Sequence, residues 1–282
     1  MTVSVSASHL RLLVRLFLFG GLLVLATSPV QAQQVRVIEK TVDLAPEGDV
    51  AVVAERGSIR VEGWDRSVVE VTAQVRDWEA DRADQPPVSI TKEGSTVRIN
   101  TADADPDGAG LWRLIGLGGA EGPVTNYSVR MPASASLSVT TQEGSVEIQG
   151  LASEVVAEGY SASMEIRDLS GKATAATYSG PLRAENVRGP LTLATFSGDT
   201  TVQGAAPATK HTVASFSGDA EIAFPADAAF DLQTSISWGG GVTSDFPLPD
   251  STAQGDGPVS IGGGGPTVTF ESFSGSLTLR AE

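Results

Sequence analysis

Small residues recur every nine positions along the middle of this 282-residue chain. From Gly144 onward, two steps of nine make a longer unit of 18 residues, in which Gly144, Ala162, Gly180 and Gly198 hold equivalent positions. Ser153, Gly171 and Gly189 mark the half-steps. A fixed short period with small residues at its corners is typical of solenoids, whose repeats pack only on their neighbours. The spacing therefore predicts a repeat architecture.

Apolar and polar residues alternate within each unit. Nine residues at about 3.3 Å each fit a short strand followed by a tight turn, and period-two alternation is the pattern of a strand with one buried face. We expect an all-β solenoid or β-roll of stacked short strands, with an 18-residue repeat and a single continuous core. Small residues at 157, 175 and 176 predict a narrow interior. The predicted inner columns are Val146–Met164–Leu182–Thr200 and Ile148–Ile166–Ala184–Val202.

The same register predicts ion pairs on the outer surface. Glu165 is expected beside Arg183, and Arg167 beside Glu185. Opposite charges on neighbouring strands each contribute roughly a few tenths of a kcal/mol to a sheet. Two such pairs at one offset favour the 18-residue register.

The first 32 residues have the pattern of a secretory signal peptide. Arg11 and Arg15 precede the apolar run Leu16–Leu25, and Ala32 ends a small-residue cleavage site. The run is shorter than the roughly 20 residues that a helix needs to span a membrane. We therefore expect an exported protein of the periplasm, the cell surface or the extracellular space, with no stable membrane span after cleavage.

The composition limits the partners of the chain. Asp and Glu number 34 against 19 Lys and Arg, which gives a formal net charge of −15. So acidic a chain is not expected to bind nucleic acid or an anionic membrane. The chain has no cysteine, so no disulfide is available to stabilise it after export.

Residues 33–282 are expected to form the solenoid, but the repeat is regular only in their middle. The sequence before it has irregularly spaced strand patterns and predicted turns at Gly57, Gly63 and Gly94. The Gly- and Pro-rich sequence after it is predicted to hold longer strands and a hairpin that closes one end. The predicted parts are an irregular N-terminal part at 33–135 with a loop insertion at 102–124, a regular array at 136–224 and closing strands at 225–282.

Three features carry a family resemblance. They are Glu-Arg-Gly-Ser-Ile-Arg-Val-Glu-Gly-Trp-Asp at 55–65 with the strand at 69–71, the stretch Tyr127–Pro132, and the recurring Thr/Ser-x-Ser-Gly-Asp units. The chain resembles the bacterial "putative adhesin" family, a toastrack-like domain of unknown function built of β-strand repeats. The resemblance implies an exported, non-enzymatic protein of the cell envelope, active in surface attachment or in envelope-stress sensing. The 102–124 insertion departs from the family pattern.

Aromatic residues stand two positions before successive turn markers. If these residues stack, they form a ladder along one edge of the solenoid. Such a ladder stabilises stacked strands by about 0.5–1.5 kcal/mol per pair. The alternative is an exposed strip on which sugar rings stack, with Tyr160 and Tyr178 as contact residues. The series consists of Tyr160, Tyr178, Phe196, Phe216 and Phe273.

The insertion holds two further candidate sites. Asp103, Asp105 and Asp107 resemble the start of a calcium loop, but its twelfth position is occupied by Leu114 instead of an acid. A solvated acidic turn is the alternative, and no other cofactor is expected. The apolar run after it either caps an end of the solenoid or docks a partner. Its apolar residues are Leu111, Trp112, Leu114, Ile115 and Leu117.

Catalysis has little support in the sequence. His211 is the single histidine after the leader, and it aligns with Leu191 of the preceding repeat, which indicates a scaffold position. No Gly-x-Ser-x-Gly elbow is present, and His/Cys metal sites lack ligands. We therefore expect a protein that is not an enzyme, although pairs of surface carboxylates leave a surface-polysaccharide-active enzyme as a remote alternative.

The sequence thus favours an adhesin-like binding or structural module of the bacterial envelope. The alternative from another class is a periplasmic component of envelope-stress signalling that binds a membrane partner. The expected partner is an envelope protein or a glycan, and open edge strands leave self-association as a further option.

Overall fold

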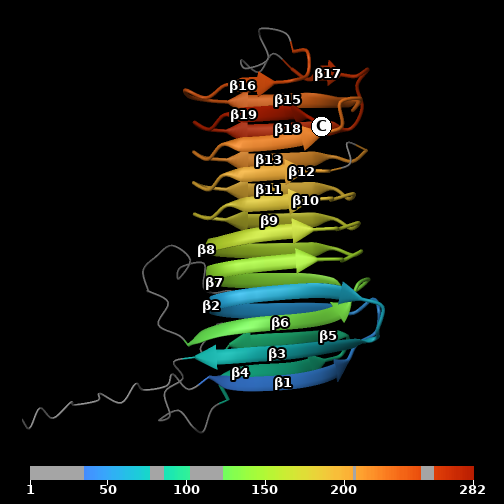
Figure 1. The fold of residues 1–282 in the computed structure, drawn as a ribbon, viewed down its shortest axis with the longest axis vertical. Coiled ribbons are helices and arrows are strands. Elements are labelled where there is room, and N and C mark those ends of the chain that lie inside the picture. The colour runs from blue at the N-terminus through green and yellow to red at the C-terminus, as the bar shows by residue number, and fades with distance from the viewer. Residues whose placement is uncertain (1–34, 77–85, 102–122, 206–207, 249–256) are drawn as a thin grey trace, which may run out of the picture. The chain divides into compact units, whose positions relative to one another are not determined.

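The computed structural model describes residues 35–76, 86–101, 123–205, 208–248 and 257–282. Regular structure in these residues is all β, with no helix among them, and it forms one sheet of 19 strands (Figure 1). The predicted all-β solenoid is therefore confirmed. The predicted signal peptide at 1–32 lies outside the described residues.

The regular array consists of parallel coils, each of which pairs with the next one in the chain (Figure 1). The first two coils are the long strands β7 (Ser136–Gln149) and β8 (Val155–Arg167). Each later coil contributes two short strands, one to either side. These are β9 (Ala173–Thr177) with β10 (Leu182–Glu185), β11 (Leu191–Thr195) with β12 (Thr200–Gln203), and β13 (His211–Ser215) with β14 (Ala220–Phe224).

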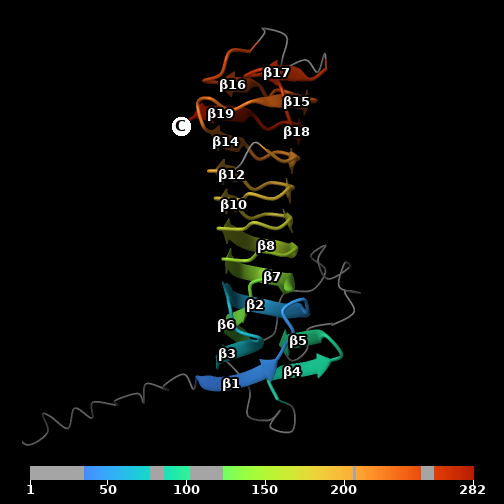
Figure 2. The same ribbon diagram turned by 90° about the vertical axis from the view of Figure 1, so that its right-hand side faces the viewer.

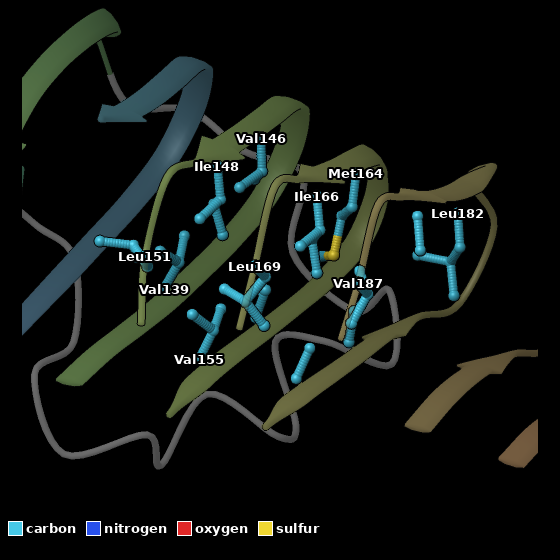
Figure 3. Packing of buried hydrophobic residues seen from close by; sticks show 14 of the residues in the cluster. Val139, Val146, Ile148, Leu151, Val155, Met164, Ile166, Leu169, Leu182 and Val187 are labelled. Carbon is cyan, nitrogen blue, oxygen red and sulfur yellow. The ribbon is translucent and has the colours of Figure 1, made fainter. Parts of the chain in front are cut away.

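The register of the array confirms the predicted columns. Leu182 lies between Met164 and Thr200, one 18-residue step from each. Side chains from both sides of a coil meet in the interior, as Val146, Ile148 and Leu151 show for one coil (Figure 3). A single hydrophobic cluster runs from Leu44 to Leu279. The core predicted to be continuous is therefore continuous.

Close backbone stacking at the corners explains the nine-residue spacing of small residues. A Cβ atom on Gly198 would lie 1.9 Å from the carbonyl oxygen of Gly180, the residue one coil earlier. At the other corner, a Cβ atom on Gly189 would lie 2.0 Å from the carbonyl oxygen of Gly171. Neither position has room for a side chain, so the small residues are a packing requirement of the stack.

The N-terminal part is built on one long strand, β2 (Asp49–Trp64). One edge of β2 pairs in parallel with β7, and the other edge pairs with β5 (Thr96–Thr101) and β6 (Val124–Pro132), which together fill one layer. The expected turns at Gly57 and Gly63 are wrong, because β2 continues through both residues. Within β2, Gly57 adopts φ 121°, and a Cβ atom on it would lie 2.2 Å from the carbonyl oxygen of Thr125.

Antiparallel strands complete this end of the sheet. β3 (Val68–Arg76) pairs antiparallel with β6 and with β1 (Arg36–Asp43), and β4 (Val88–Glu93) forms a hairpin with β5 (Figure 2). The predicted turn at Gly94 joins these two strands, with φ 60°.

The C-terminal strands do not stack in chain order. β18 (Thr267–Ser272) and β19 (Leu277–Ala281) lie directly on β13 and β14. The earlier strands β15 (Phe230–Ile236) and β16 (Val242–Ser244) lie on the far side of them, and β17 (Val259–Ile261) pairs antiparallel with β15. Longer strands are predicted here, and β15 and β18 have seven and six residues, whereas β16 and β17 have only three. The predicted hairpin is replaced by an antiparallel pair of β15 and β17, which are not consecutive in the chain.

Candidate binding groove

Five aromatic side chains stack in the predicted series at one corner of the coils, and we call them the aromatic ladder. Successive ring centroids are 4.5–4.9 Å apart and the ring planes differ by 4–8°. Because β18 lies on β13, Phe273 joins the series after Phe216, although 57 residues separate them in the chain. The ladder consists of Tyr160, Tyr178, Phe196, Phe216 and Phe273.

The rings cover one another's faces and leave their edges exposed. Tyr178, Phe196 and Phe216 each have a ring on both sides, yet they remain 40–43% exposed. A sugar ring stacks on an aromatic face, not on an edge. Sugar stacking along this strip stays a prediction, and neighbouring rings already cover the faces of the three inner rings.

An open groove with a volume of about 910 Å³ runs beside the aromatic ladder. The rings form one wall, and the floor is a column of alanines on the outer face of the neighbouring strands. Ala176 pairs with Ala194, and Ala194 with Ala214, so the column crosses β9, β11 and β13. Ala176 was expected to fill the interior with Ala157 and Ala175, but it points outward, because it is one residue out of phase with Ala175. The floor of this open groove is uncharged.

A glutamate stands at each end of the alanine column. Glu158 of β8 pairs in register with Ala176, and Glu271 of β18 pairs with Ala214. Both residues line the groove and are exposed. Within the described part of the chain, neither carboxylate has a hydrogen bond or an ion pair. Four strand spacings of about 4.8 Å separate the two residues, which gives about 19 Å.

The other side of the coils carries a network of ion pairs instead of a groove. The predicted pairs are present, with 3.5 Å between Arg183 Nε and Glu165 Oε1 and 3.3 Å between Arg167 Nε and Glu185 Oε2. Glu147 accepts hydrogen bonds from Arg60 of β2 at 2.9 and 3.1 Å and one from Arg167. The Arg60 hydrogen bonds, with a contribution from Arg167, lower the pKa of the Glu147 carboxyl. Paired carboxylates of this kind stabilise the register and leave no free group for a ligand.

The remaining predicted site residues are not assembled into a second site. Asp103, Asp105, Asp107, Leu111, Trp112, Leu114, Ile115 and Leu117 all lie outside the described residues. Where the structure is described, no three His, Cys, Asp or Glu side chains are grouped so as to hold a metal ion. His211 is buried and pairs with Leu191 in the register, as expected of a scaffold position. The described residues also contain no helix that could cross a membrane.

The sequence pattern predicts the wall of the groove but not its alanine floor or the two glutamates that flank the alanines. A signal existed, since alanine stands two residues before three consecutive rings, at 176, 194 and 214. At the corresponding positions of the outer repeats, 158 and 271, the residue is glutamate. Small and acidic residues on a strand do not by themselves indicate a site, whereas their common register with the ladder does.

Stacked coils, a filled core and an open outer groove define a β-solenoid whose accessible groove lies on the outside. The chain belongs to the family described as Toastrack DUF4097, which it matches over residues 47–279. The resemblance inferred from its turn and strand motifs is therefore confirmed. No curated protein matches the chain.

Several solved structures are similar to the chain over most of its length. A putative adhesin from Bacteroides fragilis is 11% identical, with 88% of this chain and 97% of that chain covered and a TM-score of 0.48. A putative adhesin from Parabacteroides distasonis is 12% identical, with 86% and 97% covered and a TM-score of 0.44. A putative lipid binding protein from the same species is 12% identical, with 86% and 96% covered and a TM-score of 0.43.

Proposed function

We propose that this protein is an exported, non-catalytic, adhesin-like binding module of the bacterial cell envelope. The groove beside the aromatic ladder carries the proposal. The interior of the coils is filled by side chains such as Ile166 and Leu193, which are 1% exposed, so a ligand must bind on the outside. The groove is an outer surface that is apolar, concave and several coils long, as expected of a contact site.

Site-specific cross-linking in living cells tests this function. A photoreactive amino acid replaces Ala194 on the groove floor, and in a matched variant it replaces Thr201, which points outward from β12 of the same coil on the other side. We expect a discrete adduct with an envelope protein or with cell-wall glycan from position 194 and none from position 201. Equal adducts from both positions, or none from position 194, would contradict the proposal.

Protease treatment of intact cells tests the location. A surface-exposed module is cleaved while cytoplasmic markers stay intact, and a periplasmic one is cleaved only after the outer barrier is opened. A shielded protein that cross-links to one membrane protein in equal amounts would favour a component of envelope-stress signalling. A protein that is protected from protease under every condition that also protects the cytoplasmic markers would exclude both the surface and the periplasmic location.

A further inference from the structure

We propose that the groove binds an extended peptide segment in which apolar residues are flanked by two basic residues about 20 Å apart. The proposal rests on the proposed function, because it names the ligand class of the same groove. It follows from three properties of the groove, namely the charges at the two ends of its alanine column, the apolar lining between them and the distance that separates the charges.

The charges call for a cationic group at each end of the ligand. Glu158 and Glu271 are exposed and lack partners among the described residues, whereas Glu147, Glu165 and Glu185 on the other side of the coils are all paired with arginines. Among the described residues, none that lines the groove is basic. The two carboxylates at the rim attract positive charge, and no cation of the described lining offsets them.

The centre of the groove calls for apolar groups. Between the two glutamates the floor is the alanine column, and the wall consists of the edges of Tyr178, Phe196 and Phe216. The edge of an aromatic ring carries partial positive charge, so a cation is disfavoured there. A ligand with charge along its whole length would also lose hydration against the alanines without gaining a partner.

The distance between the two glutamates matches an extended peptide. A strand rises about 3.3 Å per residue and turns every second side chain to the same face, so residues six apart lie about 20 Å apart on one face. Glu158 and Glu271 are about 19 Å apart by four strand spacings. The matching pattern is basic-x-apolar-x-apolar-x-basic. The groove runs across the strands, whose backbone groups are already paired in the sheet, so the peptide binds through its side chains.

Other occupants fit less well. A second copy related by a two-fold axis would bring glutamate against glutamate, either Glu158 against Glu271 or each against itself, in a chain with net charge −15. A glycan cannot stack on the inner rings, because their faces are covered. An anionic lipid headgroup would be repelled by the same two carboxylates.

Fluorescence anisotropy with labelled synthetic peptides tests the inference on the full exported chain. The probe is a seven-residue peptide with capped ends, lysine at both ends, valine at the third and fifth positions and serine elsewhere. We expect binding that weakens by about tenfold when sodium chloride is raised from roughly 0.05 to 0.5 M, because exposed charge pairs are screened by salt. A peptide of the same composition with its lysines adjacent should bind weakly, and one with glutamate in place of lysine should not bind.

Protein variants assign the binding to the groove. Glu158→Gln and Glu271→Gln should each weaken binding about fivefold, and Ala194→Arg, which fills the floor with a positive charge, should abolish it. Glu221→Gln is the matched control, because Glu221 is a carboxylate of β14 on the other side of the coil and should leave binding unchanged. The melting temperature of each variant checks its folding.

Three outcomes would overturn the inference. They are no binding of the lysine peptide by the wild-type chain, equal binding of the lysine and glutamate peptides, and unchanged binding by the two glutamine variants. Failure here together with a discrete cross-link from position 194 would leave the groove as a contact site for another ligand. Peptide binding in solution without any cross-link in cells would instead contradict the proposed function.

Discussion

The regular array and the N-terminal part use the same strands and the same core but assemble them differently. In the array, each residue pairs with one 18 or 20 positions away, as Leu191 does with Ala173 and His211. In the N-terminal part, β2 pairs with strands much later in the chain, so that Arg60 lies beside Glu147, 87 residues on. The array repeats both in its sequence and in its strand pairing. The N-terminal part continues the same stack of strands, but its sequence does not follow the 18-residue period.

Because of this difference, the two regions are stabilised by different contacts. A coil of the array contacts only its neighbours, so its stability is a sum of local terms. β2 has partners on both edges from three different segments, and the loss of any of them removes a layer that no neighbouring repeat replaces. The N-terminal part should therefore tolerate changes of length poorly and the array should tolerate them well.

Deletion of whole segments should give the largest contrast. Removal of residues 180–197 joins Ser179 to Gly198 and takes out one coil in register, so we expect a folded, shorter stack. Removal of β3, residues 68–76, takes away the antiparallel partner of both β1 and β6, and we expect an unfolded or aggregated product. Circular dichroism and size-exclusion chromatography distinguish the outcomes. Two equally folded deletion variants would show that the regions do not differ in this way.

Two glycine substitutions should give a smaller contrast. Gly198→Ala places a Cβ atom 1.9 Å from a backbone oxygen of the preceding coil, and we expect a loss of about 2–4 kcal/mol in the free energy of unfolding. Gly94→Ala meets no atom within 4 Å and only has to adopt φ 60°, so we expect a loss of about 1 kcal/mol.

Urea denaturation of both glycine variants measures these losses. Ser197→Ala, an exposed change beside Gly198, serves as the control and should be neutral. A Gly198 variant as stable as the wild type would mean that the corner spacing relaxes and that the nine-residue period is not a packing requirement.

The smallest effect concerns the contact between the two regions. Because the hydrogen bonds from Arg60 lower the pKa of Glu147, the pair stabilises the folded state at neutral pH. That contribution is complete above the ordinary carboxyl value of about 4.5 and is lost as the pH falls through the lowered pKa of Glu147. Glu147→Gln should cost about 0.5 kcal/mol at pH 7 and less at acidic pH, where the carboxyl becomes protonated in the folded state. A penalty that is the same at neutral and at acidic pH, measured by urea denaturation, would exclude the charge as its cause.

The sequence predicted the array well because its period is constant. Once Gly180 and Gly198 are recognised as equivalent, every column between them follows, including the aromatic ladder. The position of β2 could not be predicted, because no period links residues 49–64 to 136–149. For the same reason Gly57 was interpreted as a turn, although it lies over Thr125, which is distant in sequence. The groove was incompletely predicted because Ala175 and Ala176 look alike in sequence and differ only in the face they occupy.

The position of β18 and β19 bears on how the chain is made. They follow β15 and β16 in the chain but lie between those strands and β13 and β14 in the sheet. A chain that emerges from a ribosome or an export channel in order therefore presents β15 before the strand on which β15 must rest. Residues 136–224 can add to the stack one coil at a time in chain order. This order is interrupted after β14, because the next strands in the stack, β18 and β19, come later in the chain than β15 and β16. One edge of β13 and one edge of β15 stay without their final partner until residues 267–272 have emerged.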